Sequence, residues 1–213
     1  MSADLTEEWA RAFIHERMPH GRFGMFERLA DLLVEENTRQ NLVSKSSLEM
    51  VWVRHFADSA QIVDHVSRET GAWLDLGSGA GFPGIALAIM LPEATIHLVE
   101  SRKRRVEWLG YAIESLGLAN CRMHGQRLEL IEPFPVDVVT ARAFAPLEKL
   151  LNLSAAFSTV RTEWVLPKGR SAAQELHALK KRSRQMFHVE QSATDGDAAI
   201  LVGRGRIKPE GKR

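Results

Sequence analysis

The residues best suited to chemistry lie in a glycine-rich stretch between positions 73 and 84. Its first half, Trp73-Leu-Asp-Leu76, is apolar except for one acid, and its second half holds four glycines within eight residues, 77–84. An apolar run over 85–91 follows and ends at Pro92. Glycines in such a turn let the backbone bend tightly and let a ligand approach without a Cβ in the way. The stretch therefore predicts a buried strand, a ligand-binding turn and a helix.

The segment Gly79-Ala-Gly-Phe-Pro-Gly84 matches the GxGxxG pattern, which is typical of dinucleotide sites. The carboxylate of Asp75 favours S-adenosylmethionine instead, because that cofactor carries an ammonium and a sulfonium group and no pyrophosphate. The backbone at Gly77 and Gly79 is expected to line the amino-acid end of this cofactor. Glu100 ends the next expected strand, where an acid binds ribose hydroxyls of either cofactor. The sequence favours adenosylmethionine, and a nicotinamide cofactor remains the alternative.

Several features bear on the group that would accept a methyl. Methyl transfer mainly requires that nucleophile, methyl and sulfur be held in line. The Asn/Asp-Pro-Pro-Tyr/Phe loop that serves exocyclic base amines is replaced here by Thr140-Ala-Arg-Ala-Phe-Ala145. Cys121, the only cysteine, lies in an unrelated expected strand and is interpreted as a buried filler rather than a nucleophile. A ring nitrogen such as guanine N7 needs no general base, which suits a site without an evident acid or base.

The elements that must position these residues follow two patterns. Apolar residues recur at helical spacing over the first 70 residues, and no strand pattern precedes Gly71. Strands and helices then alternate, which indicates a parallel sheet with right-handed crossovers. Strands are expected at 72–76, 95–100, 121–124, 136–140 and 164–166, with helices at 84–91, 102–116, 146–157 and 172–184. Segments 186–189 and 198–202 are expected to form an antiparallel hairpin at the sheet edge.

These patterns predict an α/β fold of the class I, Rossmann-like methyltransferase type, with a seven-stranded, mostly parallel sheet. The expected organisation is a helical N-terminal appendage at 1–70, a cofactor-binding domain at 71–202 and a basic, flexible tail at 203–213. Residues 1–70 hold 8 Lys/Arg and 12 Asp/Glu, a net charge of 8 − 12 = −4, whereas residues 71–213 hold 20 and 15, a net charge of +5. The basic clusters at 102–105, 180–184 and 204–213 are either solvated faces or contacts for a polyanion.

Composition narrows the class of protein. The 213 residues are 45% hydrophobic and 26% charged, as in ordinary globular domains. No apolar run approaches the ~20 residues that cross a bilayer. The acidic start lacks the plan of a signal peptide, and a single cysteine excludes an internal disulfide and a cysteine-cluster metal site. We expect a cytoplasmic protein that binds no metal or membrane, and a monomer, although the sequence does not fix the oligomeric state.

Six segments in order resemble one known family: Asn41-Leu-Val-Ser44, Arg54-His-Phe-Ala-Asp-Ser59, Asp75-Leu-Gly-Ser-Gly-Ala-Gly-Phe-Pro-Gly84, Glu100-Ser101, Arg127-Leu-Glu129, and Ala141-Arg-Ala143 with Lys168-Gly169. This series, over roughly residues 37–170, is similar to the RsmG (GidB) family of bacterial 16S rRNA methyltransferases. The resemblance implies an adenosylmethionine-dependent enzyme that methylates guanine N7 in the 530 loop. The implied partner is 16S rRNA, the small ribosomal subunit or its assembly intermediate.

The resemblance also implies roles for residues of the cofactor site. Gly77 and Phe82 would contact the cofactor, and Glu100 would bind its ribose hydroxyls. Leu128 and Glu129 would border the adenine; a smaller residue is expected at the leucine position in this family.

Further residues would face the methyl group and the RNA. Arg142 would lie near the methionine end, where it would position the incoming base or a phosphate. His55 and Asp58 either brace the helical appendage or form a wall of the RNA pocket. Lys168 is either a phosphate contact or a solvated loop lysine, and Phe144 either stacks on a base or belongs to the core.

Two other functions remain open from the sequence. One is a methyltransferase that acts on a small molecule or a protein. The other is an adenosylmethionine-binding RNA chaperone or assembly factor without turnover.

Overall fold

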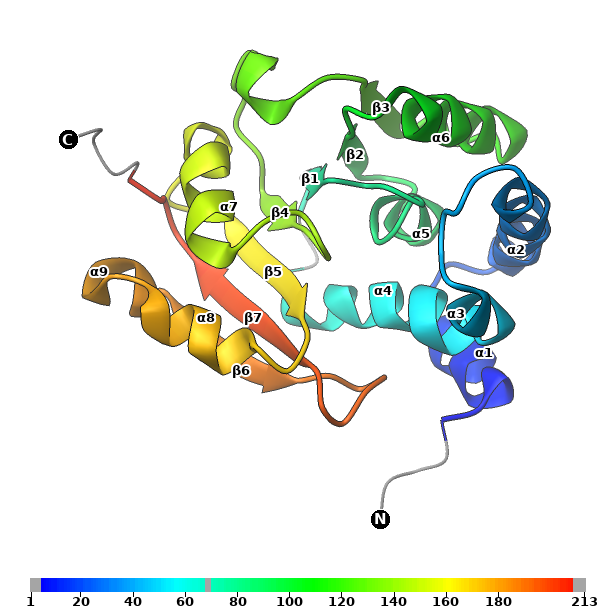
Figure 1. The fold of residues 1–213 in the computed structure, drawn as a ribbon, viewed down its shortest axis with the longest axis horizontal. Coiled ribbons are helices and arrows are strands. Elements are labelled where there is room, and N and C mark those ends of the chain that lie inside the picture. The colour runs from blue at the N-terminus through cyan, green and yellow to red at the C-terminus, as the bar shows by residue number, and fades with distance from the viewer. Residues whose placement is uncertain (1–4, 68–69, 209–213) are drawn as a thin grey trace.

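A seven-stranded sheet forms the centre of the protein in the computed structural model, which describes residues 5–67 and 70–208 (Figure 1). The strand order is β3-β2-β1-β4-β5-β7-β6, and β7 alone runs antiparallel to its neighbours. The strands are β1 (Ala72–Leu76), β2 (Thr95–Val99), β3 (Cys121–His124), β4 (Val138–Thr140), β5 (Glu163–Lys168), β6 (Phe187–Gln191) and β7 (Ala199–Arg204). The predicted fold class, including the terminal antiparallel hairpin, is confirmed.

Helices cover both faces of this sheet (Figure 1). Neighbouring residues of a strand point to opposite faces, so that Trp73 packs in one hydrophobic cluster and Leu74 in the other. The first cluster includes residues of α1 (Glu7–His15), α2 (Phe23–Asn37), α5 (Gly84–Met90) and α6 (Lys103–Ser115), and the second includes residues of α7 (Leu147–Ser154) and α8 (Ala172–Ala178). The shorter helices are α3 (Lys45–Glu49), η1 (Trp52–Ala57), α4 (Asp58–Ala60), η2 (Gln61–His65), η3 (Leu128–Leu130), η4 (Ala155–Phe157) and α9 (Lys181–Arg184).

The helices that precede β1 share a core with the sheet. The buried rings of Phe26 and Phe56 lie with their centroids 5.1 Å apart, and Phe56 in turn packs on Phe82 of the glycine loop at 5.7 Å. Arg22 Nε donates to the carbonyl of Ile89 in α5 at 2.7 Å. The segment between α3 and β1 therefore lies directly against the loop that the sequence singled out.

The helical segment that precedes β1 is not a continuous α-helix. It begins as α3, which ends at Glu49, and continues as the π-helix η1, then α4, then the 3₁₀-helix η2. The backbone N–H groups of Trp52 and Val53 donate to the carboxylate of Glu7, at 3.2 and 3.0 Å. A side chain of α1 thus accepts hydrogen bonds from the first N–H groups of η1, which have no partner within the helix. Wider π turns occur frequently at functional sites, and η1 contributes two cavity residues described below.

Several boundaries differ from the expected ones, and three of the differences are informative. The helix expected over 172–184 is two helices, because Leu179 is buried with an extended backbone between them. The strand expected from Val136 begins at Val138. Strand β7, which lies between β5 and β6, extends to Arg204, and Ile207 beyond it is buried, so the first residues assigned to a flexible tail belong to the sheet; residues 209–213 lie outside the described residues.

Candidate functional site

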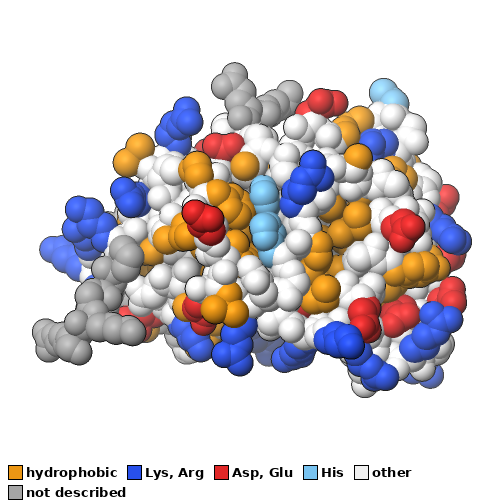
Figure 2. Space-filling model, turned by 90° about the horizontal axis from the view of Figure 1, so that it is seen from above, with side chains coloured by type: hydrophobic (Ala, Val, Ile, Leu, Met, Phe, Trp, Pro, Cys, Tyr) orange, Lys and Arg blue, Asp and Glu red, His pale blue; other side chains and the backbone are white. Residues whose placement is uncertain are grey.

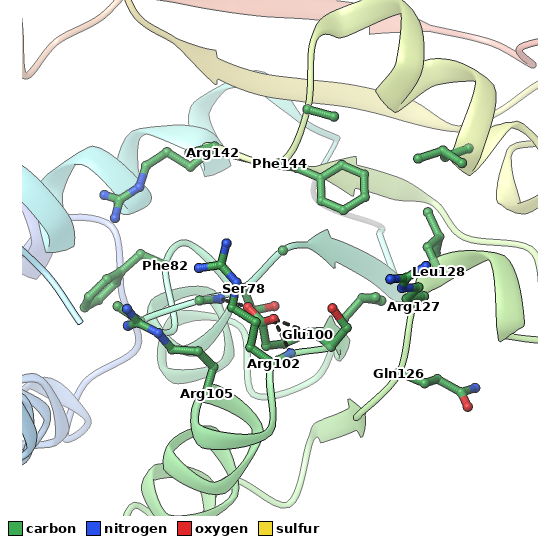
Figure 3. A pocket seen from close by; sticks show the side chains of 18 of the residues that line it. Ser78, Phe82, Glu100, Arg102, Arg105, Gln126, Arg127, Leu128, Arg142 and Phe144 are labelled. Carbon is green, nitrogen blue, oxygen red and sulfur yellow. Dashed lines mark hydrogen bonds between the residues drawn. The ribbon is translucent and has the colours of Figure 1, made fainter. Parts of the chain in front are cut away.

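A large cavity lies at the carboxyl ends of β1, β2 and β4, at the edge where parallel sheets bind ligands (Figure 3). Its volume is about 580 Å³. The loops that follow β1, β2, β3 and β4 supply most of its wall, with residues of α6, α7 and the α2–α3 connection. Its lining residues are Leu42, Gly77, Ser78, Gly79, Ala80, Phe82, Val99, Glu100, Ser101, Arg102, Arg105, Gln126, Arg127, Leu128, Glu129, Arg142, Ala143, Phe144, Ala145, Lys149 and Leu153.

The glycine loop forms the floor of this cavity. Gly77 and Gly79 have φ angles of +69° and +55°, which side chains with a Cβ rarely adopt. A Cβ on Gly77 would also lie 2.9 Å from Cδ2 of Phe144, across the cavity entrance. Trp108 in α6 donates to the carbonyl of Ala80 at 3.0 Å and holds the loop from below. The floor is thus backbone that a ligand can approach closely.

Asp75 lies beneath this floor and does not line the cavity. It is fully buried, and Oδ2 accepts a hydrogen bond from Gly84 N at the start of α5, at 3.1 Å. Burial raises the pKa of the carboxyl to about 6. The sequence suggested a direct contact between Asp75 and the cofactor; in the structure its carboxylate faces the turn between β1 and α5 and helps to fix it.

Glu100 reaches the cavity from the end of β2. One carboxylate oxygen accepts from the backbone N–H groups of Ser101 and Arg102, at 2.7 and 2.8 Å, and the other accepts from Gly79 N at 3.2 Å. These three hydrogen bonds fix both carboxylate oxygens of Glu100 beside the glycine loop (Figure 3). Such an oriented carboxylate can accept from two neighbouring hydroxyl groups of a ligand.

The other end of the cavity is formed by the turn after β3. Leu128 is buried and Glu129 is exposed, and both line the cavity; the contact with adenine that the resemblance implies stays a prediction. Gln126 and Arg127 line it too, and the sequence reasoning did not select them. Their place directly after a parallel strand could have identified them, because every βα turn at this edge faces the same cavity.

Three arginines stand around the opposite end of the cavity. Figure 3 shows Arg142 on one side of Phe82 and, on the other side, Arg102 and Arg105 at the start of α6. Arg105 donates through Nη2 to the carbonyl of Asn41, while its buried Nη1 has no hydrogen-bond partner among the described residues. The sequence placed Arg102 and Arg105 only in a basic cluster. Their position gives this end of the cavity groups that can bind a carboxylate.

Arg142 also lines a second cavity, of about 280 Å³, together with His55, Asp58 and Lys168. The Nη1 atom of Arg142 lies 3.0 Å from Nδ1 of His55 and 3.5 Å from Oδ2 of Asp58. His55 and Asp58, which the sequence paired through their spacing, are thus brought together through Arg142. Because Arg142 belongs to both cavities, a ligand in one lies next to a ligand in the other.

His55 is buried and stacks on Phe82, with ring centroids 4.9 Å apart. Burial, with the nearby charges of Arg142 and Arg54, lowers the pKa of His55 to about 3. The ring is therefore neutral, and its Nδ1 accepts from the arginine, so the proton lies on Nε2. Among the described residues Nε2 has no hydrogen-bond partner.

This lowered pKa predicts a specific pH dependence of stability. Between pH 6.5 and about pH 3 the unfolded chain binds a proton at His55 that the folded protein does not, so stability is lost as pH falls below 6.5. His55→Gln removes this contribution. Its destabilisation, measured by urea unfolding, should be smaller at pH 5 than at pH 7.5 by about 2 kcal/mol. An equal cost at the two pH values would contradict a neutral, buried imidazole.

Lys168 and Phe144 have partners in the structure. Lys168 Nζ forms an ion pair of 2.9 Å with Glu175, which also accepts from Leu147 N at 3.0 Å, so the lysine is not a freely solvated loop residue. Phe144 is half-buried against the second hydrophobic cluster and lies beside Gly77. Cys121 is buried, and burial raises the pKa of its thiol to about 12, as expected of a filler.

Some classes of site are not seen in the described part of the chain. Residues 5–67 and 70–208 contain no group of three or more His, Cys, Asp or Glu side chains placed to hold a metal ion. Within the same ranges, no helix has the length and apolarity needed to cross a membrane.

Comparison with known proteins gives matches over nearly the whole chain. The model of the GidB family, described as rRNA small subunit methyltransferase G, matches residues 23–198. The ribosomal RNA small subunit methyltransferase G of Erythrobacter litoralis is 62% identical over 203 residues, which cover 95% of this chain and 98% of that protein. The protein of the same name from Rhizorhabdus wittichii is 48% identical over 98% of this chain and 96% of its own length.

Solved structures agree on the fold. A ribosomal protein L11 methylase from Lactobacillus delbrueckii subsp. bulgaricus has a TM-score of 0.57 at 10% identity, over 75% of this chain and 80% of that one. TYW2 of M. jannaschii, solved in complex with AdoMet, has a TM-score of 0.54 at 14% identity, over 80% of each chain. At such low identity these similarities concern the architecture alone.

Proposed function

Because the chain belongs to the rRNA small subunit methyltransferase G family, we propose that it transfers a methyl group from S-adenosylmethionine to N7 of a guanine in the 530 loop of 16S rRNA. The observation that carries this proposal is the pair of cavities joined at Arg142. The larger cavity has the features of an adenosylmethionine site, and the smaller one adjoins it at the end where the methyl group would lie.

The residues of the larger cavity fit adenosylmethionine. Glu100 would accept from the two ribose hydroxyls, and Leu128 and Glu129 would border the adenine. The Cβ-free floor at Gly77 and Gly79 would admit the amino-acid portion. When bound, the cofactor supplies a methyl group already activated on a sulfonium.

Arg105 and Asp75 would act on the amino-acid end of the cofactor in different ways. The unpartnered Nη1 of Arg105 would bind the cofactor carboxylate. Asp75 would act through the loop that it holds, and not by contact.

The work of the protein in this reaction is positioning. Guanine N7 has a free lone pair, so no side chain has to remove a proton before transfer. Phe82, stacked on His55, would form the wall between the cofactor and the incoming base, and Arg142 would orient that base in line with the methyl group. RNA phosphates would meet basic side chains at the rim, including Arg54 and Lys149, with an affinity that falls as salt rises.

A methyl-transfer assay tests this proposal. Protein incubated with labelled adenosylmethionine should transfer label to one guanine of unmodified 16S rRNA, supplied naked, in an assembly intermediate or in the complete small subunit. Reduction followed by aniline cleavage should break the strand at that guanine, as expected for N7 methylation. Cofactor and RNA binding without transfer to any of the three substrates would leave a non-catalytic assembly factor as the function. Label in a protein or small molecule, with none in RNA, would also contradict the proposal.

A further inference from the structure

The second cavity lies between the π-helix η1, the end of β5 and the loop that joins β6 to β7. Its lining includes Asp58, Arg142 and Thr194, which come from three separate parts of the chain. At about 280 Å³ it has half the volume of the cofactor cavity, which suits one heterocyclic base better than a longer stretch of RNA. Enzymes that modify a base in structured RNA commonly take that base out of the stack and into such a pocket.

Asp58 is held in this cavity by a buried polar network. Its Oδ1 accepts from Gln61 Nε2 and from the hydroxyl of Thr194, each at 2.9 Å. Gln61 also accepts from Ala193 N at 2.8 Å and contacts the hydroxyl of Ser192, so the β6–β7 loop is fastened to the helix. Fixed on one side in this way, the carboxylate cannot rotate freely.

The other oxygen of Asp58 has spare capacity. Among the described residues, Oδ2 has only the contact of 3.5 Å with Arg142 Nη1, longer than a good charge-assisted hydrogen bond. A carboxylate oxygen can accept more than one hydrogen bond, and the Asp58 side chain is about one-fifth exposed. The cavity therefore contains an oriented carboxylate oxygen, Oδ2 of Asp58, that can accept further hydrogen bonds from a ligand.

We propose that this cavity binds the target guanine, and that Asp58 recognises it by accepting from its N1–H and 2-amino groups. Guanine presents donors on that edge, whereas adenine presents the bare acceptor N1, which a carboxylate repels. With this edge against Asp58, the adjacent edge, with O6 and N7, turns toward Arg142, which neighbours Asp58, and toward the cofactor cavity. The inference rests on the proposed function and adds to it the site and the selectivity for guanine.

The same contact would assist the reaction itself. Methylation at N7 places positive charge on the ring system and makes N1–H a stronger donor. A hydrogen bond from N1–H to a carboxylate therefore strengthens as the transition state forms, and such a contact raises kcat as well as binding. Asp58 would be a catalytic residue in this sense, since it touches the reacting base, while His55 would be a positioning residue that acts through Arg142.

The test compares guanine with inosine, which lacks only the 2-amino group, at the target position of a ligated 16S rRNA. The wild-type protein should prefer guanine in kcat/KM by about ten- to a hundredfold, as expected for a lost hydrogen bond to a charged group. Asp58→Asn keeps an oxygen for Gln61 and Thr194 but places an amide donor where Oδ2 stood. Its preference for guanine over inosine should fall to about threefold or less.

Asp197→Asn is the matched control, because Asp197 lies in the same β6–β7 loop but is exposed, pairs with Arg170 and does not line the cavity. It should keep the wild-type ratio, and Asp58→Asn should keep the wild-type affinity for adenosylmethionine. A wild-type ratio near one, or equal loss on both RNAs in Asp58→Asn, would overturn the assignment while the proposed function stands. Failure of the wild-type protein to methylate the guanine RNA would instead remove the proposed function.

Discussion

Arg142→Met is expected to lower kcat/KM for the RNA substrate by about 10³-fold while the affinity for adenosylmethionine changes only a few-fold. Arg142 joins the two cavities and contacts His55 Nδ1 and Asp58, so methionine removes the group that orients the base against the methyl donor. Loss of a preorganised charged donor from a protected site commonly costs this much in rate. Methionine fills a similar space without the positive charge.

The measurement must separate catalysis from folding. Removal of the partly buried guanidinium leaves Nδ1 of His55 without its hydrogen-bond donor and Oδ2 of Asp58 without its ion pair, so stability should also fall, by about 3 kcal/mol. Rates should therefore be compared at a temperature where unfolding curves show both proteins fully folded. Arg142→Lys keeps the charge but not the branched guanidinium, and should recover part of the rate.

Arg39→Met serves as the control, since Arg39 is exposed just after α2 and its ion pairs in the described part of the chain are with Glu35 and Glu36 of that helix. Its substitution should leave the midpoint of urea unfolding and the rate nearly unchanged. If Arg142→Met kept kcat within a few-fold of wild type, the arginine would be a structural brace and not a positioning residue.

Glu100→Ala is expected to weaken adenosylmethionine binding by about 30-fold, measured by isothermal titration calorimetry. Hydrogen bonds to a charged acceptor contribute about 1.5–3 kcal/mol, and each 1.4 kcal/mol is a tenfold change in affinity. Glu100 also fixes the backbone of Gly79, Ser101 and Arg102, so some of the loss would come from a looser loop.

A 2′-deoxy analogue of the cofactor separates these two causes. The wild-type protein should bind the analogue more weakly than adenosylmethionine, whereas Glu100→Ala should bind both with similar affinity. Glu129→Ala, which changes an exposed acid at the adenine end, should cost only a few-fold. If Glu100→Ala still distinguished the analogue as well as the wild type does, the ribose role of Glu100 would be wrong.

The sequence was sufficient for the architecture and for placing several residues of the larger cavity. Alternation of apolar strands and helical runs specifies a parallel sheet, and the carboxyl ends of its strands must then meet at one edge. The sequence alone places Gly77, Gly79 and Glu100 at that edge, because each lies just after the end of a strand. Segment boundaries were less secure where a tertiary contact decides them: Glu7 supports a π-helix at Trp52, and a buried Leu179 interrupts a helix.

Contacts between distant parts of the chain were decided only by the tertiary structure. Asp75 follows the pattern of a ligand-binding acid, yet the close packing of α5 places it under the loop, bonded to Gly84 N. Asp58 and Thr194 are 136 residues apart and share a hydrogen bond, and Arg142 meets both Asp58 and His55. Spacing along a chain reports which residues share an element, but a buried polar group takes whichever partner folding brings within reach. The sequence thus determined the fold and the floor of the cofactor site, and the packing of η1 and the β6–β7 loop around Arg142 created the cavity beside it.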